Sequence, residues 1–159
     1  TACNKKVKEE AVVDPNANAG QQTQPADQGT GISEPGAFTA ADLDSNSCLM
    51  QRVIYFDYDQ DLLRPEYQAV VACHTKYLRD RPSARMSLEG NADERGTREY
   101  NLGLGERRSN AVASAFAGSG ADASRVNAVS YGEERPLCLD SDESCWSKNR
   151  RVEIVYSVK

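Results

Sequence analysis

The chain has 159 residues and a formal net charge of -5, with 19 basic and 24 acidic side chains. This acidic balance excludes nucleic acid as a general partner, because phosphate binding requires clustered basic side chains. No apolar run approaches the length of about 18 residues that a membrane-spanning helix needs. Any contact with a membrane is therefore expected to depend on an anchor.

The first third of the chain reads as a tether. Residues 4–38 are mainly Ala, Asn, Gln, Gly, Pro and Asp, which cannot bury enough surface to offset the entropy of ordering. We expect a tether over residues 1–46 and one packed domain over residues 47–159. Cys3 follows two small residues, which resembles the end of a bacterial lipobox, where the cysteine becomes the acylated first residue of the mature protein. The alternative is an unpaired cysteine in a loose terminus.

The rest of the chain alternates strand and helix patterns. β-Branched and aromatic runs predict strands, and apolar residues at steps of three and four predict helices. A proline in a first turn and Thr97 as an N-cap mark two helix starts. The expected elements are a short helix 39–46, strand 52–56, helix 65–80, strand 86–90, helix 98–117, strand 126–131, helical turn 143–147 and strand 152–156. The order βαβαβ(α)β predicts an α/β (α+β) two-layer sandwich.

Four cysteines lie in the part expected to pack. Cys138 and Cys145 stand in a Pro- and Asp-rich segment without the CxxC or histidine partners of a zinc site, so a loop disulfide is the better interpretation. Cys48 precedes the first strand and Cys73 lies on the helix that should pack behind it. These two are either a second disulfide or two small buried apolar side chains. Disulfides indicate an oxidising compartment, hence the periplasm or the exterior.

The most informative segment is 88–108, which runs from a strand through a polar loop into the second long helix. The strand delivers Asp93 into the loop, and Asn101, Leu104 and Arg108 follow on one face of the helix. An acid at the mouth of the helix and a guanidinium two turns along would bracket a zwitterion. On residue types alone, an exposed ion pair worth at most about 1 kcal/mol is the alternative.

Two glycines, Gly103 and Gly105, interrupt the same helix. Each costs about 0.8 to 1 kcal/mol relative to alanine. A ligand that approaches the helix backbone would explain them.

Several segments together resemble the OmpA-like domain family. They are Tyr55-Phe56-Asp57-Tyr58-Asp59, the loop Glu89 to Thr97, Tyr100-Asn101 with Leu104 to Arg108, Val129 to Gly132, and Asn149 to Val152. The resemblance covers about residues 53–156 in the expected order, and it is closest to the lipid-anchored branch of the family. It implies a mixed four-stranded sheet with the helices packed on one face.

The resemblance also implies a site and a role. Asp93 and Arg108 would bind meso-diaminopimelate in the peptide stems of peptidoglycan, the carboxylate accepting from the ligand ammonium and the guanidinium pairing with its carboxylate. Tyr58 and Asp59 would close the pocket. Its floor would be Thr97, Asn101 and Leu104. Asn91, Arg98 and Gly103 depart from common family residues, which puts the shape of the pocket in question more than its existence.

The implied biology is a tether at the periplasmic face of the outer membrane of a Gram-negative bacterium. Acylated Cys3 would hold the membrane, the domain would hold peptidoglycan, and TolB and other Tol proteins would be partners. No cofactor or metal is expected. The alternatives are the wall-binding module of another OmpA-like envelope protein and a periplasmic cell-wall hydrolase. The single histidine, His74, is explained by helix packing and has no nearby nucleophile, which argues against an enzyme.

Overall fold

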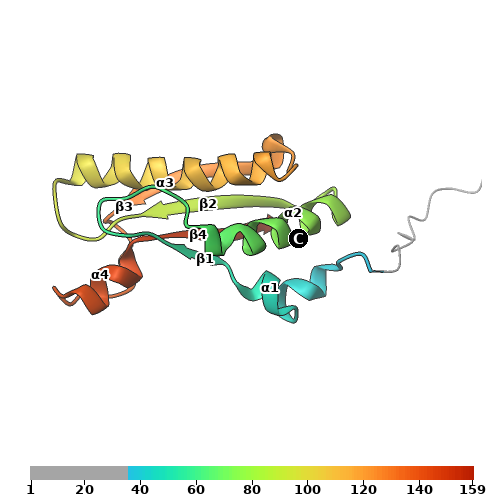
Figure 1. Cartoon of the computed structure of the whole chain (residues 1–159), viewed down its shortest axis with the longest axis horizontal. Helices are drawn as coiled ribbons and strands as arrows, with labels where there is room; N and C mark the ends of the chain where they lie inside the picture. The colour runs from blue at the N-terminus through green and yellow to red at the C-terminus, as the bar shows by residue number, and fades with distance from the viewer. Residues whose placement is uncertain (1–35) are drawn as a thin grey trace, which may run out of the picture. The chain divides into compact units, whose positions relative to one another are not determined.

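The computed structural model of the protein describes residues 36–159, so Cys3 and most of the predicted tether lie outside the described residues. The main elements are α1 (Ser47–Met50), β1 (Val53–Tyr55), α2 (Gln68–Asp80), β2 (Arg85–Asn91), α3 (Arg98–Gly118), β3 (Val126–Gly132), α4 (Glu143–Asn149) and β4 (Arg151–Val158) (Figure 1). Short 3-10 helices cover Ala40–Asp44, Pro65–Tyr67 and Ala123–Arg125. The predicted strands and helices are present, with small shifts at their ends. No helix within residues 36–159 combines the length and the apolar composition needed to cross a bilayer.

The four strands form one mixed sheet in the order β1-β4-β2-β3. β2 and β3 are parallel because α3 carries the chain back between them, while β4 runs antiparallel to both β1 and β2. The last strand in the sequence is therefore an inner strand of the sheet. This topology confirms the predicted α/β sandwich.

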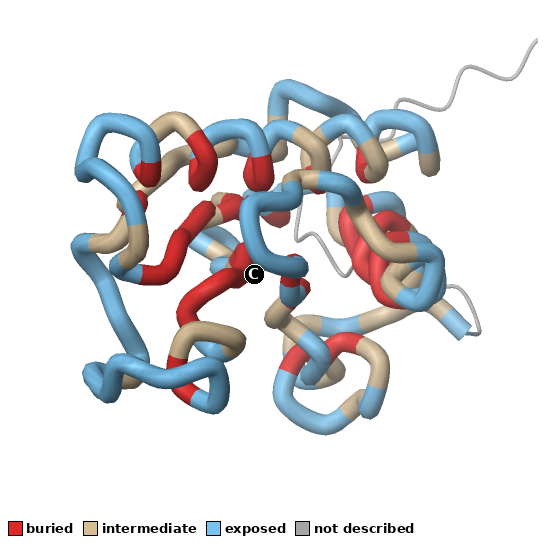
Figure 2. The backbone as a smooth tube through the Cα atoms, turned by 60° about the vertical axis from the view of Figure 1, so that its left-hand side comes forward, coloured by how far each residue is buried: buried red, intermediate tan, exposed pale blue. Residues whose placement is uncertain are grey.

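The helices α2 and α3 cover one face of the sheet, as predicted. Along β2 the side chains of Met86 and Leu88 are buried, whereas Ser87 and Glu89, which alternate with them, are only partly covered. On β4 the side chain of Ile154 is likewise buried, and that of Val155 is exposed. Figure 2 shows the buried stretches of the backbone gathered in the interior of the domain. The buried residues of the two strands form one core with residues of α2 and α3 that include Val71, Leu78, Val112 and Phe116. One hydrophobic face is enough to fix the register of every strand.

The packed unit begins before the predicted boundary at residue 47. Leu43, in the first 3-10 helix, is fully buried in the core, and Phe38 packs against it. The backbone N–H of Phe38 also donates to the Asp80 carboxylate at 2.9 Å. A disulfide between Cys48 and Cys73 joins α1 to α2. Residues 36–46 therefore belong to the domain, because their apolar side chains complete its core beside the C-terminal end of α2.

The crossing of α3 over β2 explains Gly105 by packing. A Cβ on Gly105 would lie 2.3 Å from Oγ of Ser130 and 2.9 Å from the carbonyl oxygen of Gly90. A Cβ on Gly90 would lie 1.9 Å from the carbonyl oxygen of Gly105. The interpretation that a ligand approaches Gly105 is therefore wrong: the neighbour is the protein's own sheet. Gly103 faces no such neighbour, and nothing in the structure explains it.

Alanine substitutions at these two glycines are expected to have opposite effects. Gly105→Ala should lower the free energy of unfolding by about 1 to 3 kcal/mol, because the methyl group separates α3 from the sheet. Gly103→Ala should raise it by up to about 1 kcal/mol through helix propensity alone. Urea unfolding of both variants checks this expectation. Equal effects would show that α3 and β2 are not in this contact.

His74 is a buried structural residue of α2, as the sequence indicated. Its Nε2 lies 3.0 Å from the carbonyl oxygen of Gln51, and its Nδ1 lies 2.8 Å from the hydroxyl of Tyr156. A neutral ring satisfies both contacts by donating to the carbonyl and accepting from the hydroxyl. Burial, and to a smaller extent the nearby charge of Arg52, lower the pKa of His74 to about 4, against an opposing hydrogen bond to Gln51. The ring therefore stays neutral in the folded protein at neutral pH.

Acidification is expected to destabilise the domain through His74. Between pH 6.5 and about 4 the unfolded chain binds a proton on this ring that the folded protein does not, so the free energy of unfolding falls as the pH falls. The loss should reach about 3 kcal/mol. Urea unfolding at about pH 7 and about pH 4.5 should show a smaller fall for His74→Gln than for the unmodified protein. Equal falls would contradict the assignment.

Candidate functional site

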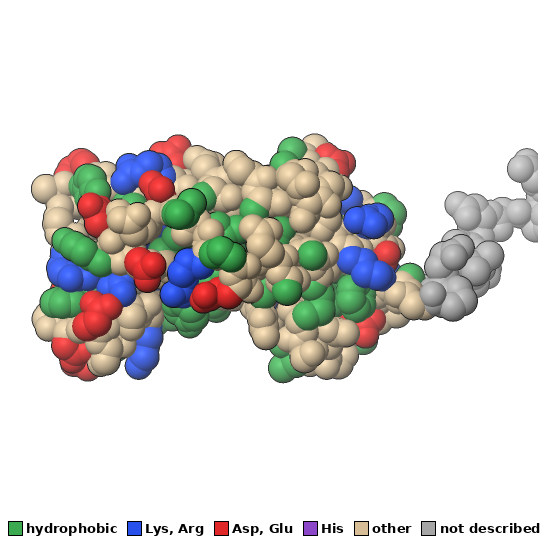
Figure 3. Space-filling view, viewed as in Figure 1, with side chains coloured by type: hydrophobic (Ala, Val, Ile, Leu, Met, Phe, Trp, Pro, Cys, Tyr) green, Lys and Arg blue, Asp and Glu red, His purple; other side chains and the backbone are tan. Residues whose placement is uncertain are grey.

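A cavity of about 120 Å³ lies where the loops after β1 and β2 meet the first turns of α3. Its lining is formed by Tyr58, Asp59, Asp93, Arg95, Gly96, Tyr100, Asn101 and Leu104. Acidic and basic side chains lie next to one another on the surface at this end of the domain, around α4 (Figure 3). The cavity therefore offers both signs of charge within one small space.

Strand ends and two unusual backbone positions set the lining in place. Asp59, in the loop after β1, has a φ of 53°, a left-handed conformation that aspartate adopts more readily than most residues. Asp93 stands just beyond the end of β2 at Asn91. Gly96 has a φ of 105°, which glycine alone adopts without strain, and it turns this loop into α3. The hydroxyl of Thr97 then accepts a hydrogen bond from the backbone of Tyr100, as the predicted N-cap.

Asp93 is almost completely buried and fully paired, with 5% of its side chain exposed. Its Oδ1 accepts from the backbone N–H and from Nε of Arg95, at 3.0 and 3.1 Å. Its Oδ2 accepts from Nη2 of Arg95 at 2.7 Å and from Nη1 of Arg150 at 3.4 Å. Burial alone would raise the pKa of Asp93, but the hydrogen bonds from Arg95 and Arg150 hold it below its usual range. The carboxylate is therefore charged at neutral pH.

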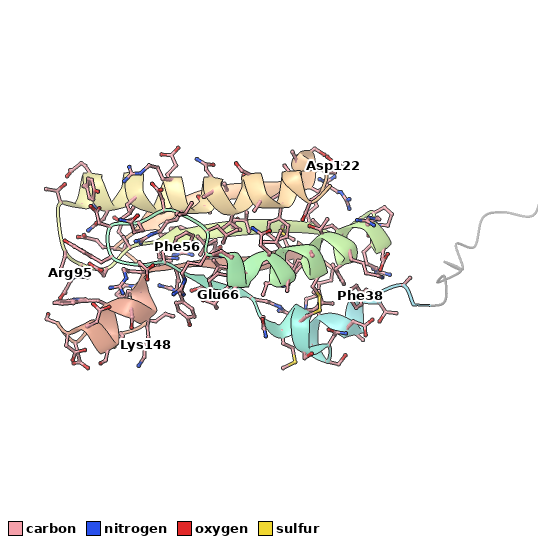
Figure 4. The ribbon with its side chains drawn as sticks, viewed as in Figure 1. Phe38, Phe56, Glu66, Arg95, Asp122 and Lys148 are labelled. Atoms are coloured by element: carbon pink, nitrogen blue, oxygen red, sulfur yellow. A yellow bond between two sulfur atoms is a disulfide. The ribbon has the colours of Figure 1, made fainter. Side chains whose placement is uncertain are left out.

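Arg95 lies between two aromatic rings at the mouth of the cavity. Its guanidinium carbon is 4.0 Å from the ring centroid of Tyr58 and 4.0 Å from that of Trp146. Its Nη2 lies 3.8 Å from the carboxylate of Glu143 on α4. The hydrogen bond to Asp93 is the main cause that raises the pKa of Arg95. This residue joins the loop after β1, the loop after β2 and α4 (Figure 4).

Arg108 is not among the residues that line the cavity, and its contact with a ligand stays a prediction. Its side chain is fully buried beneath the loop after β1, where it donates to the carbonyl oxygens of Gln60, Asn91 and Asp57 at 2.8, 2.9 and 3.1 Å. Helical spacing placed it on the correct face of α3, but loop carbonyls cover it there. Burial lowers its pKa to about 10, and Asp93 opposes that shift, so Arg108 remains a cation close to the cavity.

Most other predicted site residues do meet at the cavity. Tyr58, Asp59, Asn101 and Leu104 line it together with Asp93. Asn101 donates from Nδ2 to the carbonyl oxygen of Asp93 at 3.1 Å, which ties α3 to the loop. Thr97 is outside the lining because its hydroxyl caps α3.

Sequence reasoning missed three lining residues, Arg95, Gly96 and Tyr100. The hydroxyl of Tyr100 donates to the carboxylate of Asp59 and so joins α3 to the loop after β1. The partner of Arg95 on α4, Trp146, lies about fifty residues further along the chain, and no local pattern indicates that contact. A glycine just before the start of a helix often has a positive φ, and this is the only signal in the sequence that could have pointed to Gly96.

The segment 138–150, which follows the cavity-lining residues in the sequence, is held by a second disulfide and a buried arginine. Cys138 is bonded to Cys145, and the side chain of Asn149 binds the backbone of Cys138 through both its oxygen and its nitrogen. Arg150 donates from Nε to the carbonyl oxygen of Phe56 at 3.0 Å, besides pairing with Asp93. These contacts fix α4, and with it Trp146, against the cavity.

The sequence model of the OmpA family matches residues 55–150. This span is more than half of the chain and contains the whole lining of the cavity. The chain therefore belongs to the OmpA family, as the resemblance of its loops and strands predicted.

Comparison with individual proteins shows which branch of the OmpA family the chain resembles. The peptidoglycan-associated lipoprotein of Haemophilus influenzae is 43% identical over 121 residues, which cover 76% of this chain and 76% of that protein. The peptidoglycan-associated lipoprotein of Pseudomonas putida is 42% identical over 146 residues, covering 92% of this chain and 80% of that protein. The crystal structure of the peptidoglycan-associated lipoprotein from Burkholderia pseudomallei matches with a TM-score of 0.70 and 43% identity, over 72% of this chain and 97% of that one. Within the family, the chain falls among the peptidoglycan-associated lipoproteins.

Proposed function

We propose that the domain binds the peptide stems of peptidoglycan at the cavity beside Asp93 without cleaving them. Two observations support this function. The relatives that match most of the chain are peptidoglycan-associated lipoproteins by name. The cavity holds a buried, charged carboxylate together with the guanidinium of Arg95, which suits a doubly charged amino-acid terminus. The observation that carries the proposal is Asp93 in the wall of the cavity.

The stem residue proposed as the ligand is meso-diaminopimelate. Its free end bears an ammonium and a carboxylate on one carbon. The carboxylate of Asp93 accepts a hydrogen bond from the ammonium, and Asp59 adds negative charge from the loop after β1. Arg108 contributes positive charge from beneath that loop and holds its backbone in place. Tyr58, Asn101 and Leu104 shape the space, and Thr97 fixes the start of α3.

At the level of the cell, the protein would tether the outer membrane to the wall. Acylated Cys3 would insert into the outer membrane at its periplasmic face, and the segment up to the domain would span to the wall. Many anchored copies beside a repetitive polymer raise the effective concentration, so weak single-site binding is sufficient. TolB and the other Tol proteins would bind the same protein.

Incubation of the purified chain with muropeptides of diaminopimelate type tests the binding function. The domain should retain them, and mass spectrometry should recover them with unchanged masses. New fragments would instead show a cell-wall hydrolase, and no retention would contradict the proposal. Mass spectrometry of the protein isolated from its native membrane should show acyl chains on Cys3, and an unmodified cysteine there would contradict the anchor.

A further inference from the structure

The pull on a tether enters this domain far from the site proposed to hold the wall. The segment proposed to lead to the membrane precedes Gly36 in the sequence, so a pull from that side arrives at residue 36. Phe38 lies at one end of the domain, and Arg95, in the lining of the cavity, lies at the other (Figure 4). Tension between membrane and wall therefore runs along the whole domain.

The contacts that meet this tension first are noncovalent. The carbonyl oxygen of Gly36 accepts a hydrogen bond from Nζ of Lys76 at 2.9 Å, and the same ammonium lies 4.5 Å from the ring centroid of Phe38. The buried side chain of Leu43 adds an apolar hold. Hydrogen bonds of this kind contribute only about 1 kcal/mol each, so residues 36–47 are the first to separate from the domain under tension.

The first covalent link on this path is the disulfide between Cys48 and Cys73. It joins α1 directly to α2, from which the chain continues through β2 to Asp93. The bond keeps the two Cα atoms 6.3 Å apart, whereas residues 49–72 between them could extend to about 80 Å. Tension that reaches Cys48 therefore passes through the sulfur atoms to Cys73, and residues 49–72 form a closed loop that stays slack.

The closed loop contains one side of the proposed site. It begins with β1, an edge strand of three residues that pairs only with β4. Tyr58 and Asp59 follow and line the cavity. The carbonyl oxygens of Asp57 and Gln60, which accept hydrogen bonds from Arg108, lie in the same stretch. Without the disulfide, tension from the membrane side would reach β1 and then these residues before it reached α2.

We propose that the disulfide between Cys48 and Cys73 is a mechanical bypass, which carries tension past β1 and the loop after it so that the cavity keeps its shape while the tether is pulled. This inference rests on the proposed function as a tether. General stabilisation by a disulfide does not depend on where a pull enters the chain. A bypass, in contrast, protects the site only from a pull that enters before Cys48.

A constant-force measurement on the full chain tests the bypass. Isolated sacculi are fixed to a surface, a bead is attached to the N-terminus of the chain, and the lifetime of the attachment between chain and sacculus is recorded. The double variant Cys48→Ser/Cys73→Ser should detach about tenfold or more sooner than the unmodified protein, because tension then unfolds β1 and the loop after it. Without tension, both proteins should sediment with sacculi equally well. Equal lifetimes under tension would overturn the bypass.

Moving the bead to the C-terminus provides the matched control. Tension then enters through Lys159 and β4, and the disulfide does not lie on the path to Asp93. The double variant and the unmodified protein should now detach at nearly the same rate. A loss of the same size from both ends would show general stabilisation and would overturn the bypass.

A second measurement leaves both disulfides intact and so does not depend on the folding of the serine variant. A click-reactive residue in place of Leu62, which is 76% exposed within the closed loop, carries the bead. Tension then enters behind the disulfide, and detachment should be about tenfold or more faster than with the bead at the N-terminus. Equal lifetimes for the two bead positions would overturn the bypass and leave the proposed function in place. Failure of the unmodified chain to sediment with sacculi without tension would overturn both.

Discussion

Arg108→Ala is expected to lower the free energy of unfolding by about 3 to 5 kcal/mol. The substitution leaves three carbonyl oxygens without their donor, at Asp57, Gln60 and Asn91, and opens a cavity in a fully buried place. Two of these carbonyls belong to the loop that carries Tyr58 and Asp59, so the loop should loosen as well. Urea unfolding measures the loss.

The neighbouring arginine on α3 provides the matched control. Arg107 is about half exposed and pairs with Asp61 at the surface, so Arg107→Ala should cost no more than about 1 kcal/mol. If the two variants were equally stable, Arg108 could not be bonded beneath the loop. Arg108→Lys should also be destabilised, because an ammonium cannot reproduce the planar fork that serves three separate carbonyls.

Asp93→Ala is expected to weaken binding to isolated sacculi by about 100-fold, enough to leave the protein in the supernatant after sedimentation. The substitution removes the acceptor for the ligand ammonium and leaves Arg95 and Arg150 with Glu143 as their remaining acidic partner, so the site becomes more positive. Asp122→Ala is a suitable control, because Asp122 caps the short 3-10 helix before β3, away from the cavity (Figure 4). Circular dichroism should show that both variants fold. Undiminished sedimentation of folded Asp93→Ala would contradict its role.

The fold could be predicted from the sequence because its signals are local and periodic. The alternation of Met86 and Leu88 with polar residues marks β2, and the cap at Thr97 marks the start of α3. The beginning of the domain could not be predicted in this way. Leu43 stands among polar residues, and only the assembled core, in which it packs, shows why it is buried.

The site was predictable only in part, for a physical reason. Residues close in sequence, such as Asp93, Asn101 and Leu104, meet because a strand end and a helix start bring them together. The fate of Arg108 depends instead on a loop some fifty residues earlier, whose carbonyls cover it. The contact between Arg95 and Trp146 likewise joins distant segments. Helical spacing gives the face on which a side chain lies, not what covers that face.

A structure of the domain bound to the diaminopimelate tripeptide tests the central claim most directly. The ligand is predicted to lie in the cavity beside α3, with its ammonium hydrogen-bonded to the carboxylate of Asp93. A tripeptide bound elsewhere on the domain, with no contact to Asp93, would contradict the account.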